Sequence, residues 1–521
     1  MASRARRREA GILLPLFALR SEHDWGIGEI ADLGPFCVWL AAAGHRRLQI
    51  LPIFEISPGE QSPYAALTTF GIDPIYLALR DVEDFVAGGG EAILPRGARE
   101  RLDEARAAHG IDYEGVRAVK RRALEIAFAH FLDTEWQGNS SRATDFRRFR
   151  EAARDWLGET TLYRAAKEDR AEQPWTMWEP ALRRREPAAL DAARAGLARV
   201  RLFHEYVQWI AAEQWTAACR VAGDAGVAVD GDLSFGIALD SADVWARTSQ
   251  FRLDATVGAP PDAFNAEGQD WGLPPYRWDL MRDDGFSWLR ARVRRAAELF
   301  AGCRLDHVVG YYRMFVRPSD GPPHFVPMTP AEQRALGEEL LGVVTDAGGH
   351  MALLGEDLGA VPSFVRRSLT RLRIPGYRVL RWEDDGGVFR DPRRYPPLSV
   401  ATTGTHDTST LATWWEEELC DDVRRALVEV PVFAALANAN RTFTPAVHAA
   451  LLDGLYAARS SLVLLPLQDA YGGRERINVP ATVGPGNWSY RMPWTVEELA
   501  SGAQEFLRAR LQELVRQSER V

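Results

Sequence analysis

The chain has 521 residues and a formal net charge of −9 at pH 7. A hydrophobic fraction of 46% with 26% charged residues is typical of a folded protein with a large core. The acidic balance argues against a nucleic-acid-binding protein, because phosphate contacts require a basic surface. We therefore expect small, uncharged substrates and no nucleic-acid partner.

The N-terminal apolar run at residues 11–19 follows a cluster of arginines and imitates a signal peptide. Pro15 interrupts the run and no small-x-small cleavage site follows it, so we do not expect secretion. No apolar run reaches the roughly 18 residues that a membrane span requires. The four cysteines are widely spaced and form no CxxC pair, which predicts neither a zinc site nor a disulfide framework. A reducing cytoplasm is the expected location.

Short apolar segments with helical patterns between them recur along the chain and predict eight buried strands, at residues 48–54, 73–79, 226–232, 303–309, 350–354, 376–380, 398–402 and 461–467. Strands that alternate with helices predict a parallel α/β sheet, and eight of them favour a closed (β/α)8 TIM barrel. A doubly wound open sheet is the alternative. No glycine-rich phosphate loop follows the first predicted strand, which disfavours nucleotide binding.

Charged helical periodicity rich in alanine and arginine fills residues 81–187 and predicts a helical insertion between barrel strands. Residues 1–80 then form the start of the catalytic barrel and residues 188–521 its remainder. The second part opens with a long helix, from about residue 188 to residue 222, whose aromatic stripe indicates core packing. No separate C-terminal β-domain is expected.

Three of the later predicted strands have an acidic residue near their carboxyl ends: Asp306, Glu356 and Asp407. The C-terminal ends of barrel strands meet at one mouth, so the three carboxylates should converge. Arg304, two residues before Asp306, projects to the same side and favours an ionised carboxylate. Such a set suits retaining glycosyl transfer, or alternatively Mg²⁺ binding. Arg304 and His406 beside the acids favour the first chemistry, so we expect no metal and no cofactor.

Further motifs join these acids: Gly26-Ile27-Gly28, Ser62-Pro63-Tyr64, residues 260–272, Asn478-Val479-Pro480 and Asn487-Trp488. Together they resemble the 4-α-glucanotransferases called amylomaltases or disproportionating enzymes, glycoside hydrolase family 77 of the α-amylase superfamily. The resemblance implies a transferase that moves segments of α-1,4-glucan to the 4-OH of an acceptor glucose or malto-oligosaccharide by retaining double displacement. It also implies that Asp306 is the nucleophile, Glu356 the general acid/base and Asp407 the third carboxylate.

The resemblance further implies a set of substrate-binding residues: Arg304, His307, His406, Asp232, Asp262, Gln269, Trp271, Ser62, Tyr64 and Asn478. Trp271 falls in a loop at residues 255–278 that would cover the substrate, where an aromatic plane can stack on a sugar face. Taken singly, His307 and His406 also fit structural hydrogen bonds. An α-1,4-glucan hydrolase, a Mg²⁺-dependent barrel lyase or isomerase and a non-catalytic glucan-binding protein are the alternatives. The oligomeric state is not predicted.

Overall fold

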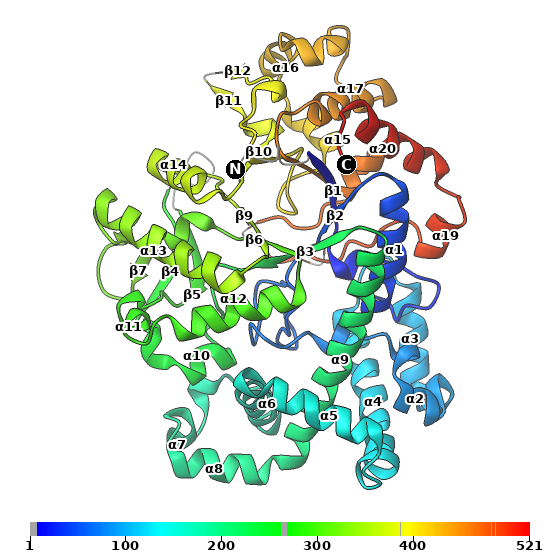
Figure 1. Ribbon diagram of the computed structural model, residues 1–521, viewed down its shortest axis with the longest axis vertical. Helices are drawn as coiled ribbons and strands as arrows, with labels where there is room; N and C mark the ends of the chain where they lie inside the picture. The colour runs from blue at the N-terminus through cyan, green and yellow to red at the C-terminus, as the bar shows by residue number, and fades with distance from the viewer. Residues whose placement is uncertain (1–7, 262–267, 386, 481, 485) are drawn as a thin grey trace, which may run out of the picture.

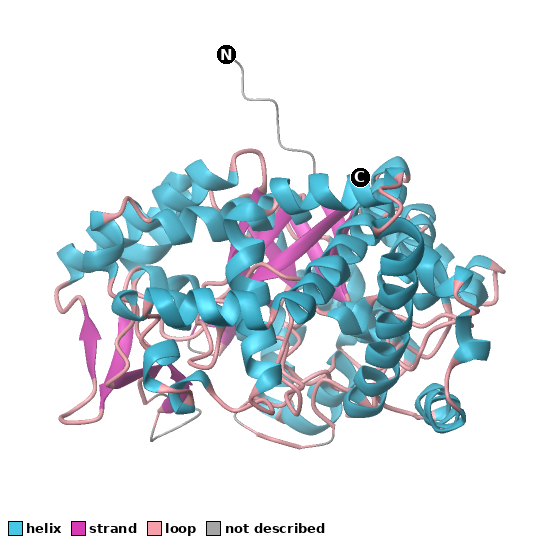
Figure 2. Cartoon of the chain, turned by 90° about the horizontal axis from the view of Figure 1, so that it is seen from below, coloured by secondary structure: helices cyan, strands magenta, loops and turns pink. Residues whose placement is uncertain are grey.

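A computed structural model describes residues 8–261, 268–385, 387–480, 482–484 and 486–521. Eight parallel strands close into a barrel in the order β1-β14-β13-β10-β9-β6-β3-β2. They run through the centre of the molecule with helices packed around them (Figures 1 and 2). The prediction of a (β/α)8 barrel is confirmed.

The barrel strands are short, and seven of them fall within the segments predicted from the sequence or overlap them. Their bounds are β1 Glu9–Leu13, β2 Arg47–Gln49, β3 Ala228–Leu233, β6 Gly302–Leu305, β9 Ala352–Gly355, β10 Gly376–Val379, β13 Ser399–Thr402 and β14 Leu462–Pro466. Parallel pairing places the carboxyl ends of all eight at one mouth of the barrel.

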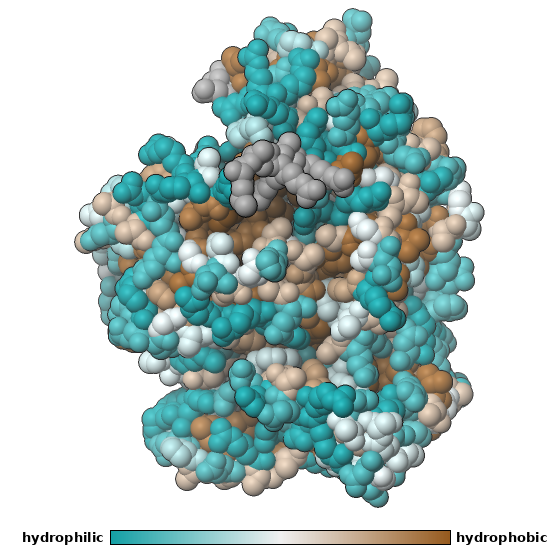
Figure 3. Space-filling view, viewed as in Figure 1, coloured by the Kyte–Doolittle hydropathy of each residue, from teal (hydrophilic) through white to brown (hydrophobic). Residues whose placement is uncertain are grey.

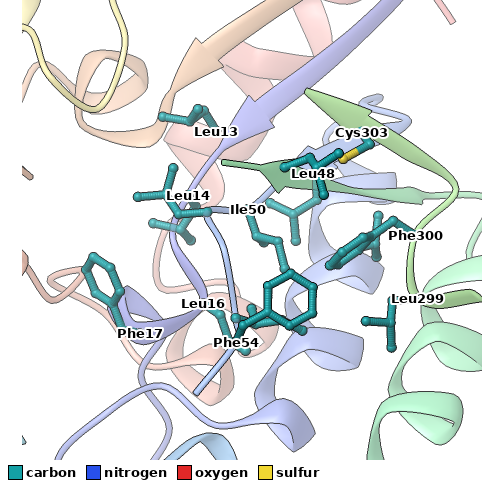
Figure 4. Packing of buried hydrophobic residues seen from close by; sticks show 14 of the residues in the cluster. Leu13, Leu14, Leu16, Phe17, Leu48, Ile50, Phe54, Leu299, Phe300 and Cys303 are labelled. Atoms are coloured by element: carbon teal, nitrogen blue, oxygen red, sulfur yellow. The ribbon is translucent and has the colours of Figure 1, made fainter. Parts of the chain in front are cut away.

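The eighth strand is β1, which was not predicted from the sequence. It begins two residues before the apolar run that imitates a signal peptide, and it pairs with β14 and β2. The run continues into the core, where Leu14, Leu16 and Phe17 are buried (Figure 4). An apolar N-terminal segment is therefore a central element of the barrel.

The predicted strand at residues 73–79 is wrong. Pro74–Tyr76 is a 3-10 turn, and the Asp73 carboxylate accepts a hydrogen bond from the Ile75 N–H. The Gln208 side chain bonds both backbone groups of Ile72, and the Gln214 side chain does the same for Ala78. The segment is apolar because it is buried, but among the described residues no strand ladder satisfies its backbone. Besides the Gln214 amide at Ala78, the Lys120 ammonium donates to the carbonyls of Ile75 and Leu77.

Helices from the loops between strands cover the outside of the barrel. They are α1 Ile30–Ala42, α9 Ala198–Asp224, α12 Ser287–Leu299, α13 Pro330–Gly348, α14 Ser363–Leu372, α17 Pro445–Tyr456 and α20 Glu505–Gln517. Helix α9 packs extensively against α1. The predicted aromatic stripe of this long helix is buried, as at Tyr206 and Trp215.

Between β2 and β3 the chain forms a group of helices before it enters α9. They are α2 Glu83–Ala87, α3 Arg96–Ala107, α4 Tyr113–Phe131, α5 Ser141–Ala152, α6 Arg154–Asp169, α7 Pro180–Arg183 and α8 Pro187–Gly196. These helices occupy the lower part of the molecule in Figure 1. Much of their surface and of the barrel face seen in that view is hydrophilic (Figure 3).

A small antiparallel sheet in the order β5-β4-β7-β8 stands apart from the barrel (Figure 2). Its strands are β4 Ala255–Ala259, β5 Gln269–Leu273, β7 Met314–Pro318 and β8 His324–Val326, and a two-stranded hairpin is formed by β11 Asp384–Asp385 and β12 Val388–Phe389. The remaining short helices are α10 Ala242–Ala246, α11 Trp278–Asp283, α15 Leu411–Thr413, α16 Asp421–Val428, α18 Leu467–Tyr471 and α19 Val496–Ala500.

One contiguous core joins the barrel to its helices. Figure 4 shows part of it, where Leu48 and Ile50 from β2 and the segment after it lie near Phe300 and Cys303. None of the helices in the described part of the chain combines the length and apolar character needed to cross a bilayer.

Candidate active site

Arg304 is the centre of a charged cluster at the carboxyl ends of the barrel strands. Its Nη1 lies 2.6 Å from Asp232 Oδ2, and its Nη2 lies 3.1 Å from Asp306 Oδ1 and 3.8 Å from Glu356 Oε2. The guanidinium is buried, whereas the Asp306 side chain is 25% exposed. One buried cation therefore gathers three carboxylates from three adjacent strands, and one of them faces the open mouth.

Asp306 and Glu356, the expected nucleophile and general acid/base, both lie near one nitrogen of that guanidinium, Nη2. Asp306 Oδ1 and Glu356 Oε2 cannot lie farther apart than the sum of their distances to Nη2. This bound excludes most of the roughly 6.5–9.5 Å range expected of an inverting pair and accommodates the roughly 5–5.5 Å of a retaining pair. The Phe235 N–H donates to Asp306 Oδ2 at 3.2 Å and fixes the other oxygen of this carboxylate.

Glu356 is held in an environment that keeps it protonated. Burial raises its pKa to about 8, the nearby Asp306 charge acts in the same direction, and Arg304 opposes both. The backbone N–H groups of His307 and Leu358 donate to its two oxygens at 2.8 and 2.9 Å. These two hydrogen bonds fix the orientation of the carboxyl group and lower its pKa. The effect of burial is larger, so the group carries its proton at neutral pH, as a general acid requires.

Asp357, the next residue, points elsewhere. Its carboxylate accepts the Tyr377 N–H at 2.6 Å and lies 3.3 and 3.4 Å from Arg366 and Arg378. The side chain is buried behind the strand ends, in the structural role expected from alternation along a strand.

Asp407 forms a second wall of the site. Asn478 Nδ2 donates to its Oδ1 at 2.6 Å, and His406 Nε2 lies 3.4 Å from its Oδ2. Arg476 Nη2 donates to the Asp407 backbone carbonyl at 2.7 Å. The Asp407 side chain is 41% exposed, so this carboxylate can meet a ligand in the barrel mouth.

An aromatic stack joins the two walls. The Tyr64 and His406 rings are stacked with centroids 5.4 Å apart, and Trp488 packs against both of them at 5.9 Å. Tyr64 O–H donates to Asp232 Oδ2 at 2.9 Å and its oxygen lies 3.1 Å from His406 Nε2. Ser62 adjoins the stack through its Oγ, which accepts the Tyr64 N–H.

Two polar atoms of this wall lack partners within the described residues: Asp232 Oδ1 and His406 Nδ1, both buried. Burial raises the pKa of Asp232 to about 7 and lowers the pKa of His406. A buried polar atom without a partner is costly unless a ligand or water satisfies it. Both atoms are therefore unsatisfied within this wall, although neither is exposed to the mouth.

The small sheet supplies a third side of the site through β5. The Trp271 indole packs edge-on against the His307 ring, with centroids 4.9 Å apart, and its Nε1 donates to Gln269 Oε1 at 2.9 Å. Burial lowers the pKa of His307 to about 4, so this imidazole is neutral. Asp262, predicted to contact substrate from the same loop, lies outside the described residues.

The structure thus gathers most of the predicted site residues around one mouth, and it adds groups that the sequence reading did not select. These are the Phe235 and Leu358 backbone amides, Arg476 and the Trp488 ring. Backbone amides carry no residue-type signal, so no motif could have identified the first two. Trp488 was visible in the Asn487-Trp488 motif, although its place beside His406 depends on the fold.

The described residues contain no group of three or more histidine, cysteine, aspartate or glutamate side chains arranged to hold a metal ion. At the carboxylate cluster, the Arg304 guanidinium lies between the acids. A cation in that place competes electrostatically with a bound metal.

Comparison with known proteins agrees with this geometry. A profile of the 4-alpha-glucanotransferases (glycoside hydrolase family 77) matches residues 14–497. A 4-alpha-glucanotransferase of Chlamydia pneumoniae is 31% identical over 504 residues, which cover 94% of this chain and 92% of that protein. One of Thermus thermophilus is 32% identical over 505 residues, covering 93% and 95%.

Among solved structures, the amylomaltase from Streptococcus agalactiae in complex with acarbose superposes with a TM-score of 0.81 at 25% identity. The match covers 99% of this chain and 100% of that one. Sequence and fold agree over nearly the whole length, and the chain belongs to the 4-alpha-glucanotransferase family, glycoside hydrolase family 77.

Proposed function

We propose that the chain transfers segments of α-1,4-glucan from a donor to the 4-OH of an acceptor glucose or malto-oligosaccharide, with Asp306, Glu356 and Asp407 as its catalytic residues. The observation that carries this assignment is the shared contact of Asp306 and Glu356 with Arg304 Nη2. This contact supports Asp306 as the nucleophile and Glu356 as the protonated acid, because it holds the two carboxyl groups at a spacing compatible with retention.

In the first step an Asp306 oxygen attacks the anomeric carbon of the donor. The bond from that carbon to the glycosidic oxygen breaks, and the Glu356 proton passes to the leaving 4-oxygen. The products are a glycosyl ester on Asp306, a Glu356 carboxylate and a shortened glucan. Arg304 stabilises the Asp306 carboxylate until the ester forms.

In the second step the 4-OH of an acceptor sugar attacks the same carbon. Its proton passes to Glu356, and the ester bond to Asp306 breaks, so that the configuration is retained. Formation of the ester removes the Asp306 charge, which is one cause of the raised pKa of Glu356. The pKa of Glu356 therefore falls while the ester exists, which keeps Glu356 deprotonated until it accepts the proton of the acceptor. The Asp306 charge, and with it the higher pKa of Glu356, returns when the product is released.

Asp407 binds sugar hydroxyl groups around the reacting ring, a role that suits its exposed carboxylate. Asp232 and His406, predicted to bind substrate as well, form the wall beside it through Tyr64. Trp271 offers an aromatic surface beside His307, and His307, Gln269, Tyr64, Ser62 and Asn478 complete the lining. The acarbose held by the Streptococcus agalactiae relative supports malto-oligosaccharides as ligands. The four free cysteines fit a reducing compartment such as the cytoplasm.

Incubation of the purified chain with maltotriose alone tests the proposal. Transfer predicts glucose together with maltopentaose and longer oligomers, while the total number of reducing ends stays constant. Glucose and maltose without longer products, with a rise in reducing ends, would instead establish a hydrolase. Activity that chelation abolishes and Mg²⁺ restores would support the metal-dependent alternative.

A further inference from the structure

Arg381 is a buried residue next to the site that the chemistry above does not use. It lies in the 3-10 turn Leu380–Trp382 directly after β10, and its side chain is 4% exposed. Its Nε donates to the Thr403 carbonyl at 3.2 Å. Its Nη1 and Nη2 donate to the Ser409 Oγ and carbonyl at 2.7 and 2.8 Å. One guanidinium therefore holds both ends of the loop at residues 403–409, which carries His406 and Asp407.

A carboxylate holds the same loop from the other side. Asp469, in α18 directly after β14, is buried. It accepts hydrogen bonds from the Thr403 hydroxyl and from the Leu411 N–H, the latter at 2.6 Å. Strands β10 and β14 flank β13 in the barrel. The loop after β13 is thus fixed from both neighbouring strands by side chains of opposite charge.

The loop between these anchors has little room to adjust. The Thr405 N–H donates to Thr408 Oγ1 at 3.0 Å, and the Asp407 N–H donates to Thr405 Oγ1 at 3.2 Å. A Cβ at Gly404 would lie 2.2 Å from Thr408 Oγ1 and 3.4 Å from Arg381 Nη2. The direction of the half-exposed Asp407 side chain therefore depends on the loop backbone and on its bond from Asn478.

We propose that Arg381 is a positioning residue for the transfer reaction, which holds the Asp407 carboxylate in place through the backbone of residues 403–409. The inference rests on the role proposed for Asp407. An arginine suits this task because its planar fork presents several donors in fixed directions, which a lysine ammonium does not. The Glu418 carboxylate lies 3.7 Å from Arg381 Nη1 and is half-exposed. The closer partners of the guanidinium are therefore the oxygens of the loop itself.

The variants Arg381→Lys and Arg381→Gln remove the fork at both ends of the loop. A displacement of about 1 Å at a reacting group can lower the rate about 100-fold, so we expect kcat to fall between about 10-fold and 100-fold while KM changes less than about 2-fold. Ser409→Ala deletes one of the three bonds and leaves both carbonyl contacts. Its kcat should fall a few-fold with an unchanged unfolding midpoint.

Arg424→Gln is the matched control. Arg424 is also a buried arginine, and it donates to the carbonyls of Trp415, Leu419 and Asn440. Its loss should lower the unfolding midpoint as much as the loss of Arg381 does, without lowering kcat at a temperature where the variant is folded. A fall in kcat confined to the Arg381 and Ser409 variants separates positioning from general stability.

The measurements are kcat and KM for maltotriose disproportionation, with unfolding midpoints for every variant and Asp407→Asn as the reference. If Asp407→Asn keeps the wild-type kcat, the role of Asp407 is wrong. If Asp407→Asn is inactive while folded Arg381 variants keep the wild-type kcat, or change KM alone, the positioning role is wrong. Should the Arg381 variants fail to fold, a wild-type kcat for Ser409→Ala overturns it.

Discussion

Strand β3 carries two buried aspartates that lie in different surroundings. Asp230 and Asp232 lie two residues apart on one face of the strand, and each pairs with an arginine from a neighbouring strand, Arg47 at 2.8 Å and Arg304 at 2.6 Å. Both side chains are fully buried, and burial raises the pKa of both, to about 6 for Asp230 and about 7 for Asp232. The chemistry available to the two residues is therefore nearly the same.

The difference lies in what surrounds them. At the amino end, both oxygens of Asp230 accept from Arg47, which also binds Glu9 at 2.7 Å, and a Cβ at Gly302 would lie 2.3 Å from the carboxylate. In that cluster both carboxylates are paired with Arg47. At the carboxyl end, Arg304 faces three carboxylates, and burial, with the Asp306 charge acting in the same direction, raises the pKa of Glu356 and favours its protonated form. The ion pairs at the amino end of the barrel therefore stabilise the fold. The cluster at the carboxyl end contains an Asp232 oxygen without a partner among the described residues and a protonated Glu356, as expected of a catalytic site.

Of the substitutions at the two ends of the barrel, Asp306→Asn should lower kcat the most. The amide cannot form the glycosyl ester, so kcat should fall on the order of 10⁵-fold, with little change in the free energy of unfolding. Maltotriose disproportionation and chemical denaturation measure the two quantities. A variant that keeps more than about 1% of the wild-type kcat would remove Asp306 from the nucleophile's role.

Asp230→Asn should show the opposite pattern. Removing one partner of a buried ion pair leaves Arg47 poorly compensated and lowers the free energy of unfolding by about 3 kcal/mol. Because the residue pairs with Arg47 at the amino end, away from the mouth that holds Asp306 and Glu356, kcat of the folded variant should stay at the wild-type value. A loss of kcat in fully folded protein would contradict the separation of the two ends.

The pH dependence reports the proton held at the open end. The first step needs protonated Glu356, and its pKa is raised to about 8, so kcat/KM should fall about tenfold per pH unit as the pH rises above 8. Glu356→Gln assayed with an α-glucosyl fluoride, whose leaving group needs no proton, should lack this basic limb. A limb that begins near pH 5 would show that Glu356 ionises normally.

Asn478→Ala should have the smallest effect. The side chain donates to Asp407, so its loss should lower kcat about tenfold, as expected for a hydrogen bond to a charged group. The resemblance alone implied a direct substrate contact, and a rise in KM with unchanged kcat would favour that role instead. Initial rates across maltotriose concentrations distinguish the two.

The alternation of strands and helices was sufficient to predict the barrel, because buried parallel strands read as apolar runs. The same property caused both errors. Residues 9–13 resembled part of a leader because a strand buried on both sides is as apolar as a signal sequence. Residues 73–79 resembled a strand because burial alone made them apolar, and only the fold reveals that the side chains of Gln214 and Lys120 bond their backbone.

For the site, too, local patterns predicted some residues and missed others. Asp306 and Glu356 could be found as acids at strand ends, and Arg304 by its alternation with Asp306. Their order around one guanidinium required the register of β6 against β3 and β9, which no local pattern contains. Arg381 offered no signal at all, since its partners are two backbone carbonyls and the Ser409 hydroxyl, which the closed barrel brings beside it.

The central claim is that Asp306 forms the covalent intermediate at the open end of the barrel. Incubation of Glu356→Gln with an α-glucosyl fluoride should accumulate this ester, because the fluoride leaves without acid and no base then activates an acceptor. Peptide mass spectrometry should find one glucosyl group on Asp306, and none in Asp306→Asn/Glu356→Gln. A glucosyl group on Asp407 or Asp232, or turnover that releases a β-configured product, would contradict this role of Asp306.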